Sequence, residues 1–334
     1  MKRILFFLLL VGHLAFAQSF PYKNLVFEGA GIRGVAYTGV LSELQSKGIM
    51  PDIEKVGGTS AGAIMALTVS LGYTGKEIEK IIYETNFNDF NDGKYFFIGG
   101  LYRMKNNYGW YQGGNFETWL DTIILAKTKN PNITFSQLHA SGFKDLYVTG
   151  TNLSTQKLMV FSRKTFPDMK IKDAVRISMS IPLYFESIFI DSTGKIYSKQ
   201  NSKNSLQVVV DGGIIGNFPI QIFDSIKFSN GKPIRVCNSH TLGIRIDSEE
   251  QIKYDNSTRE LAPCEIDDMK SYITAFYNII LENLNRSQLT EEDWKRTISV
   301  SSAGIGPKVQ KLSKEQKDIL ISSGHSSAVK FLSK

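Results

Sequence analysis

Residues 58–62 read Gly58-Thr59-Ser60-Ala61-Gly62 and stand between a short apolar strand and an apolar helix. This is the pattern of a nucleophile elbow, in which a sharp strand-to-helix turn exposes a serine hydroxyl at a helix N-terminus. The glycines suit a turn that leaves no room for Cβ atoms beside the serine. The pattern therefore predicts a serine hydrolase with Ser60 as its nucleophile.

A second glycine-rich segment, Gly29-Ala30-Gly31-Ile32-Arg33-Gly34, follows a predicted strand and opens a predicted helix. The spacing also fits a dinucleotide-binding loop, but that fingerprint needs an acidic residue about 20 positions later, at the end of the second strand. Here the second strand ends in glycine, and Glu54 precedes it. We instead expect this loop to point backbone N–H groups at the oxyanion of an acyl transfer, with a plain strand-to-helix turn as the alternative.

The serine also needs a base, which in the usual triad is a histidine held by a carboxylate. Past the N-terminal apolar segment the chain has His139, His240 and His325, and none of them stands in a glycine-flanked turn. Each is typical of an ordinary surface or helix-end histidine. An α/β-hydrolase with a histidine triad is a further alternative, although that fold places several strands before the elbow.

Asp211 is the stronger candidate for the base. It ends the apolar run 208–210 and is followed by Gly212 and Gly213, which leave space beside it. Ligand sites form at the carboxyl ends of parallel strands, and burial there would bring the pKa of a carboxylate toward the working range of a base. A tight Asp-Gly-Gly turn is the alternative interpretation.

In order and spacing, the segments 29–34, 58–62 and 211–213 resemble the oxyanion loop, nucleophile elbow and catalytic aspartate of the patatin-like phospholipases, in their bacterial, exported form. Residues 35–40, 178–182 and 217–219 add to the resemblance, which covers roughly residues 22–250. Ala30 departs from the glycine usual at its position, but alanine keeps the N–H group, so we expect the oxyanion hole to survive.

The resemblance implies a Ser60–Asp211 dyad without histidine, which hydrolyses acyl esters of lipids such as phospholipids through an acyl-enzyme. It assigns the oxyanion donors to the amides around Ala30, Gly31 and Ile32, and gives Arg33 either a structural role or a headgroup phosphate to bind. The motif residues that it carries over are Gly29, Ala30, Gly31, Ile32, Arg33 and Gly34 in the loop, Gly58, Thr59, Ala61 and Gly62 in the elbow, and Gly212 and Gly213 beside the aspartate. It implies no cofactor and no metal. A catalytically silent lipid-binding protein with the same fold is the alternative, and the need for an activating protein partner is open.

The elements that must position these residues alternate between strand and helix. Predicted strands at 24–28 and 55–57 are joined by a helix at 35–47, and a helix at 61–71 follows Ser60. This order predicts a parallel pair with a right-handed crossover in an α/β fold. The resemblance implies three layers, with a central, mostly parallel sheet flanked by helices.

Further strands are predicted at 146–151, 158–161, 207–210, 241–246 and 297–301, and further helices at 76–86, 116–125, 171–180, 265–284 and 313–322. We expect a surface loop at 192–205. Residues 87–111 are irregular and aromatic, which predicts either a cap that touches a membrane interface or a satellite core.

The N-terminal 17 residues predict a signal peptide, with Lys2 and Arg3 before an apolar run and Ala15-Phe16-Ala17 as the cleavage site. An uncleaved anchor is the alternative. The expected product is periplasmic or secreted, with peripheral attachment to a membrane also open. Domain 22–250 would be followed by a helical extension, 251–334, packed on the same domain.

Composition and charge also bear on which classes of binding partner to expect. The formal net charge is +7, with 42% hydrophobic and 21% charged residues, which is ordinary for a globular protein. No basic run is dense enough to predict nucleic-acid binding. Cys237 and Cys264 form either a disulfide or two buried thiols.

Overall fold

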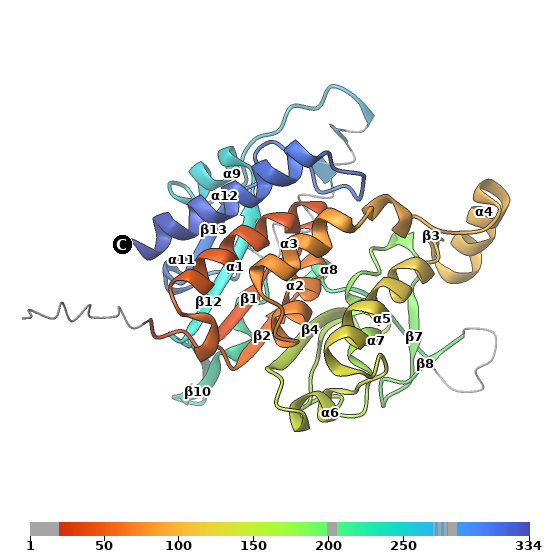
Figure 1. The fold of residues 1–334 in the computed structure, drawn as a ribbon, viewed down its shortest axis with the longest axis horizontal. Coiled ribbons are helices and arrows are strands. Elements are labelled where there is room, and N and C mark those ends of the chain that lie inside the picture. The colour runs from red at the N-terminus through yellow and green to blue at the C-terminus, as the bar shows by residue number, and fades with distance from the viewer. Residues whose placement is uncertain (1–19, 199–205, 270, 273–274, 277–278, 280–285) are drawn as a thin grey trace, which may run out of the picture.

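The computed structural model describes residues 20–334, apart from 199–205, 270, 273–274, 277–278 and 280–285. The predicted signal peptide at 1–17 lies outside the described residues, as do several residues of the predicted helix at 265–284. The described chain folds around one mixed sheet with helices packed against it (Figure 1). The predicted α/β class, with a mostly parallel central sheet, is confirmed.

The sheet runs in the order β13 (Thr297–Ser301), β12 (Thr241–Asp247), β1 (Asn24–Phe27), β2 (Lys55–Gly58), β4 (Asp145–Asn152), β9 (Gln207–Asp211), β7 (Ile188–Ile190) and β8 (Ile196–Tyr197), with β5 (Lys157–Phe161) also paired to β4. The first five are mutually parallel, whereas β5, β9, β7 and β8 each pair antiparallel to their neighbours. Two small sheets pair β3 (Gly109–Tyr111) with β6 (Leu183–Phe185), and β10 (Ser225–Ser229) with β11 (Lys232–Val236).

The α-helices are α1 (Tyr37–Ser46), α2 (Ala61–Ser70), α3 (Gly75–Glu84), α4 (Phe96–Asn107), α5 (Gly114–Thr128), α6 (Phe135–Ala140), α7 (Ile171–Ser178), α8 (Gly213–Gly216), α9 (Glu249–Asp255), α11 (Glu291–Lys295) and α12 (Lys314–Leu332). The short 3-10 helices are η1 (Gly31–Ala36), η2 (Met50–Asp52), η3 (Phe87–Phe90) and η5 (Ile220–Phe223).

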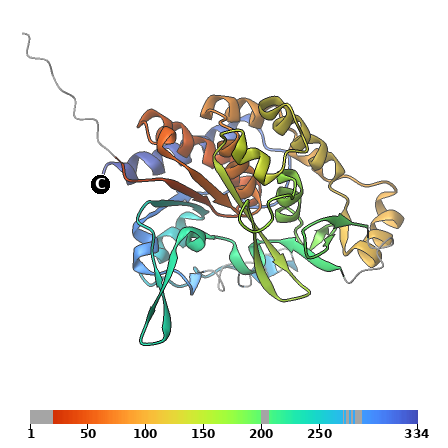
Figure 2. The same ribbon diagram turned by 90° about the horizontal axis from the view of Figure 1, so that it is seen from below.

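Both faces of the sheet are covered, and β1 shows how. Successive strand residues point to opposite faces. Leu25 and Phe27 belong to the main core, whereas Val26 packs with Phe218 and Ile220 in a second apolar cluster. Figure 2 shows helices on both sides of the strands. All four residues of β1 are buried, so the glycine-rich loop that follows the strand begins in the interior of the protein.

Strand β9 differs from the expectation that Asp211 ends a parallel strand. It runs antiparallel to β4, with Asp211 opposite Gly150. On its other edge β4 is parallel to β2, with Val148 opposite Gly58. Asp211 therefore lies near the elbow because β9 runs in the opposite direction to β2 and β4 and ends beside the C-terminal end of β2. The predicted proximity is correct, although the reasoning from strand direction was wrong.

Several predicted boundaries also change. The helix predicted at 35–47 begins earlier, as η1, and becomes α-helical at Tyr37. The helix predicted at 313–322 continues to Leu332 because it packs along α1 and β13. The loop predicted at 192–205 contains β8, and residues 199–205 lie outside the described part. Cys237 and Cys264 are both free thiols.

The aromatic segment 87–111 divides into two parts. Phe90 is buried and makes edge contacts with Phe116 and Trp119, and all three belong to the main core or pack against it, so this part does not form the separate satellite core that was one of the two expectations. The following α4 was not expected, and it leaves Phe97 69% and Ile98 81% exposed. Figure 1 shows α4 projecting at one end of the molecule. Among the described residues no helix is both long and apolar enough to cross a membrane.

Candidate active site

Ser60 occupies a strained turn between β2 and α2. Its backbone has φ 54° and ψ −123°, a region that costs a non-glycine residue about 1–3 kcal/mol. A Cβ on Gly58 would overlap the carbonyl of Gly62, and a Cβ on Gly62 would overlap the carbonyls of Phe27 and Glu28. The predicted requirement for glycine at both positions is thus explained by backbone contacts that hold the turn closed.

Hydrogen bonds around the elbow hold it in place. The Ser60 amide donates to the Ser178 hydroxyl at 2.8 Å, at the end of α7. Thr59 is fully buried, and its hydroxyl donates to the Gly216 carbonyl at 2.8 Å and lies 2.6 Å from the Thr149 hydroxyl. Sequence reasoning missed the support from Ser178, although it had noted the stretch 178–182 that carries it.

Asp211 lies beside Ser60 in the interior. The Ser60 side chain lies close enough to the Asp211 carboxyl group for its hydrogen bonding to lower the pKa of that group, and its Oγ also lies 3.5 Å from Sδ of Met179. The Gly213 amide donates a hydrogen bond to the Asp211 carboxylate at 2.7 Å. The Asp211 amide donates to the Ser180 carbonyl at 2.9 Å, which fixes the strand end. Burial raises the pKa of Asp211 to about 7, while the two hydrogen bonds oppose that rise. At neutral pH this carboxyl group can therefore both take up and release a proton.

The glycine-rich loop passes directly beside the elbow. A Cβ on Gly29 would lie 3.4 Å from Cβ of Ser60. The Gly29 amide donates to the Asn217 carbonyl at 2.9 Å, and the Ile32 amide donates to the Pro307 carbonyl at 3.2 Å. The expectation that the Ile32 amide is an oxyanion donor is therefore wrong, because Pro307 accepts its hydrogen bond. For the amides of Ala30 and Gly31, no acceptor is found within the part of the chain that the structure describes.

Arg33 has the structural role that was one of its two expected roles. Its Nε donates to the Ala30 carbonyl at 3.0 Å, three residues back in the same loop. Pro307 was not recognised from the sequence, because it lies far along the chain and carries no motif.

The three histidines lie apart from these residues. His139 contacts Asp145 at 2.8 Å, His240 contacts the Pro21 carbonyl at 2.6 Å, and His325 contacts Glu43 at 3.2 Å. All three are exposed. Their positions agree with the expectation of ordinary surface histidines.

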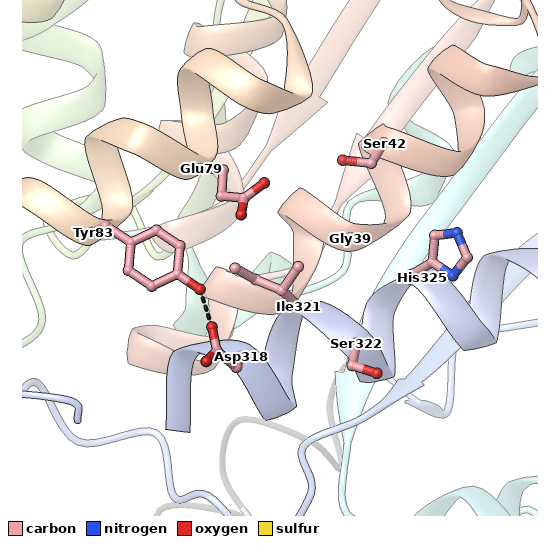
Figure 3. Close-up of a pocket in the computed structure, with 8 residues that line it drawn as sticks. All are labelled: Gly39, Ser42, Glu79, Tyr83, Asp318, Ile321, Ser322 and His325. Atoms are coloured by element: carbon pink, nitrogen blue, oxygen red, sulfur yellow. Dashed lines mark hydrogen bonds between the residues drawn. The ribbon is translucent and has the colours of Figure 1, made fainter. Parts of the chain in front are cut away.

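The described part of the chain has two cavities of note, and neither is lined by Ser60 or Asp211. One, of about 370 Å³, is lined by Tyr108, Pro182, Leu183 and Val208, and Val208 lies three residues before Asp211 on β9. The other, of about 290 Å³, lies between α1, α3 and α12 (Figure 3). It is closed at one side by a hydrogen bond from Tyr83 to Asp318.

One group of side chains has the composition of a metal site. Ligand atoms of Asp224, Cys237 and Asp293 lie within 4.8 Å of one another. Both carboxylates, however, already pair with Arg235 and Arg296, at distances from 2.5 to 3.2 Å. The two guanidinium groups supply the positive charge that a cation would bring.

The family follows from comparison with known proteins. The model of the patatin-like phospholipases matches residues 25–224. This chain belongs to the patatin-like phospholipase family.

Relatives with similar sequences match this chain over part of their length. An uncharacterised protein of Acanthamoeba polyphaga mimivirus is 33% identical over 203 residues, which is 60% of this chain and 61% of that protein. A probable lipid hydrolase of Invertebrate iridescent virus 6 is 31% identical over 214 residues, 63% of this chain and 66% of that protein. This chain thus spans less than two thirds of each.

Among solved structures, VipD from Legionella pneumophila has a similar fold, with a TM-score of 0.55 and 16% identity. The match covers 94% of this chain and 67% of VipD. At this identity the likeness concerns the patatin-like fold alone. It extends beyond residue 224, where the family match ends, into the segment that supplies β13 and α12.

The raised pKa of Asp211 predicts a pH-dependent stability difference. The unfolded carboxyl group titrates near 3.8 and the folded one near 7. As pH rises between these values the unfolded chain loses the proton and the folded chain keeps it, so folding becomes less favourable. Asp211→Asn removes this penalty. We expect the free energy of unfolding of Asp211→Asn, relative to that of the wild type, to increase from about pH 4 to about pH 7. Above about pH 7 the difference between the two proteins should be constant.

Urea unfolding at a series of pH values measures this difference. Asp168→Asn, at an exposed position, is the control and should keep a constant offset from the wild type. A constant offset for Asp211→Asn as well would show that burial does not raise the pKa of this carboxyl group.

Proposed function

We propose that this chain is a lipid acyl hydrolase in which Ser60 is the nucleophile and Asp211 the general base. The observation that carries the proposal is the position of Ser60, at a strained turn, beside the buried Asp211 carboxyl group, whose pKa is about 7 and is influenced by the Ser60 side chain. A base is most effective when its pKa lies near the working pH. Family membership favours a lipid ester as the substrate.

The reaction would proceed in two steps. Asp211 takes the hydroxyl proton as Oγ of Ser60 bonds to the ester carbonyl carbon, and the amides of Ala30 and Gly31 stabilise the resulting oxyanion. The oxyanion collapses, the ester C–O bond breaks, and the leaving alkoxide takes the proton from Asp211. Water then attacks the acyl-enzyme, giving its proton to Asp211, and Ser60 recovers its proton as the fatty acid leaves.

The cavity beside Pro182 and Val208 supports an apolar acyl group as the part of the substrate that is bound. Its apolar lining connects the strand that ends at Asp211 with Tyr108, the residue that follows α4. Since Val208 lies three residues before Asp211 on β9, an acyl chain held there would lie along the strand that ends at Asp211. Ordering the chain before reaction is the usual route by which remote contacts help catalysis.

Removal of either dyad member should abolish most hydrolysis. We expect Ser60→Ala and Asp211→Asn to lower kcat on phospholipid and on a soluble short-chain acyl ester by about a thousandfold or more, the scale seen when the nucleophile or base of a serine hydrolase is removed. Lipid-class profiling by mass spectrometry, together with ester kinetics, measures both activities.

Ser257→Ala and Asp168→Asn change the same residue types at exposed positions and should keep wild-type rates. Wild-type rates in either dyad variant would refute the proposed roles. Tight binding of vesicles by the wild type, without turnover of any ester, would instead favour a catalytically silent lipid-binding protein.

We further propose that α4 contacts the surface of a lipid bilayer. Phe97, Ile98 and Leu101 are more than half exposed and lie on one helix near Lys94 and Lys105. Aromatic and aliphatic side chains next to basic ones suit an interfacial position. The helix leads through Tyr108 to the apolar cavity, which would give a lipid a short path from the bilayer. The pattern at 1–17 supports export as the route to such a surface.

Replacement of Phe97, Ile98 and Leu101 together by serine should weaken binding to phosphatidylcholine vesicles by about tenfold or more, since each buried apolar side chain contributes roughly 1.5–3 kcal/mol. Hydrolysis of a soluble ester should be unchanged. The matched control replaces Ile226, Phe228 and Ile234, which are similarly exposed on the β10–β11 hairpin, at the other end of the molecule (Figures 1 and 2). A larger loss of vesicle binding in the hairpin variant would place the contact there and not on α4.

A further inference from the structure

Asn217 contacts the oxyanion loop at two points. Its side-chain Nδ2 donates to the Gly29 carbonyl at 3.0 Å, and its backbone carbonyl accepts from the Gly29 amide at 2.9 Å. The residue is only 6% exposed and follows α8, six positions after Asp211. The segment that carries the proposed base is therefore joined directly to the loop that carries the proposed oxyanion donors.

The planarity of the peptide bond gives this contact a consequence for catalysis. In a trans peptide the C=O and the following N–H lie in one plane and point in opposite directions. The Gly29 carbonyl and the Ala30 N–H belong to the same plane. When Asn217 holds that carbonyl, it also fixes the direction of the Ala30 N–H, which has no acceptor within the described residues.

The next peptide is held in the same way. Arg33 Nε donates to the Ala30 carbonyl, which shares its plane with the Gly31 N–H. Beyond it, the Pro307 carbonyl accepts the Ile32 amide. The loop is therefore fixed through its carbonyls at two consecutive peptides, and the N–H groups of those same peptides are left available.

We infer that Asn217 is a positioning residue for oxyanion stabilisation, which holds the Gly29–Ala30 peptide plane so that the Ala30 N–H faces the reacting carbonyl. The inference rests on the proposed function of Ser60 and adds a role that the nucleophile and base do not cover. A donor that is fixed before the reaction stabilises the oxyanion without reorganisation, and loss of one such donor costs about 100–1000-fold in kcat. Loosening one peptide plane should cost less than its loss.

The test compares four variants, Asn217→Ala, Asn217→Asp, Asn24→Ala and Ser60→Ala, with a soluble short-chain acyl ester as the probe. We expect Asn217→Ala to lower kcat about tenfold to a hundredfold with KM within about twofold, because the oxyanion exists only in the transition state. Its pH–rate midpoint should stay near that of the wild type. Asn217→Asp keeps the shape but cannot donate to the Gly29 carbonyl, so it should lose kcat at least as strongly.

Asn217→Asp also places a second carboxylate near Asp211. The position that a Cβ on Gly213 would occupy lies 3.1 Å from Oδ1 of Asp211 and 3.2 Å from Oδ1 of Asn217, so the two side chains are close together. Like charges raise the pKa of a carboxyl group. The pH–rate midpoint of this variant should therefore move upward, whereas that of Asn217→Ala should stay near that of the wild type. This difference separates the effect of the added charge from the loss of kcat that both variants share.

Asn24→Ala is the matched control. Asn24 is also buried, and its Nδ2 donates to Thr241 at 3.1 Å, but it lies at the opposite end of β1 from Gly29. We expect Asn24→Ala to lose about as much stability as Asn217→Ala but to keep the wild-type kcat. If Ser60→Ala is inactive while Asn217→Ala and Asn217→Asp keep wild-type kcat, the positioning role is refuted and the proposed function stands. If Ser60→Ala stays active, the proposed function itself fails.

Discussion

The burial of Asp211 against Ser60 is the interaction on which the rest of the site depends. A carboxyl group in the interior would ordinarily lose its charge altogether, but hydrogen bonds from Ser60 and the Gly213 amide partly offset the cost of burial. The result is a pKa of about 7, so that the group can take up or release a proton at neutral pH, as the proposed role of a base requires. A histidine supplies that pKa in the usual serine hydrolase triad. Here the same value comes from the position of an aspartate at the end of a buried strand.

The strained turn at Ser60 is maintained by backbone contacts that only glycine permits. Gly58 and Gly62 allow α2 to begin against the ends of β1 and β2, and the carbonyls of Phe27 and Glu28 fill the space that a Cβ would need. The oxyanion loop leaves β1 at the same point, so the elbow and the loop share one close contact. Packing at the strand ends thus fixes the proposed nucleophile and the proposed oxyanion donors together, and Asn217 extends that contact to the segment that carries Asp211, the proposed base.

Much of the fold and of the site could be predicted from the sequence, because glycine at fixed spacing has a direct steric meaning and apolar runs indicate buried strands. The proximity of Ser60, Asp211 and the loop at 29–34 follows from such patterns. The antiparallel direction of β9 could not be predicted, since a buried apolar run looks the same in both orientations. The roles of Ser178, Asn217 and Pro307 depend on single hydrogen bonds between segments far apart in the chain, for which the sequence has no periodic signal. Helix α4 was missed because its exposed aromatic residues do not follow the pattern of a helix packed on a core.

The pH dependence of kcat/KM on a soluble short-chain acyl ester tests the central claim most directly. If ionised Asp211 is the base, kcat/KM rises about tenfold per pH unit on the acid side and reaches a plateau above an apparent pKa near 7. The same profile should persist when His139, His240 and His325 are each replaced by glutamine, because all three are exposed and bound elsewhere. A profile that is flat between about pH 5 and 9, or one that loses its rising limb in any histidine variant, would contradict the assignment of Asp211 as the base.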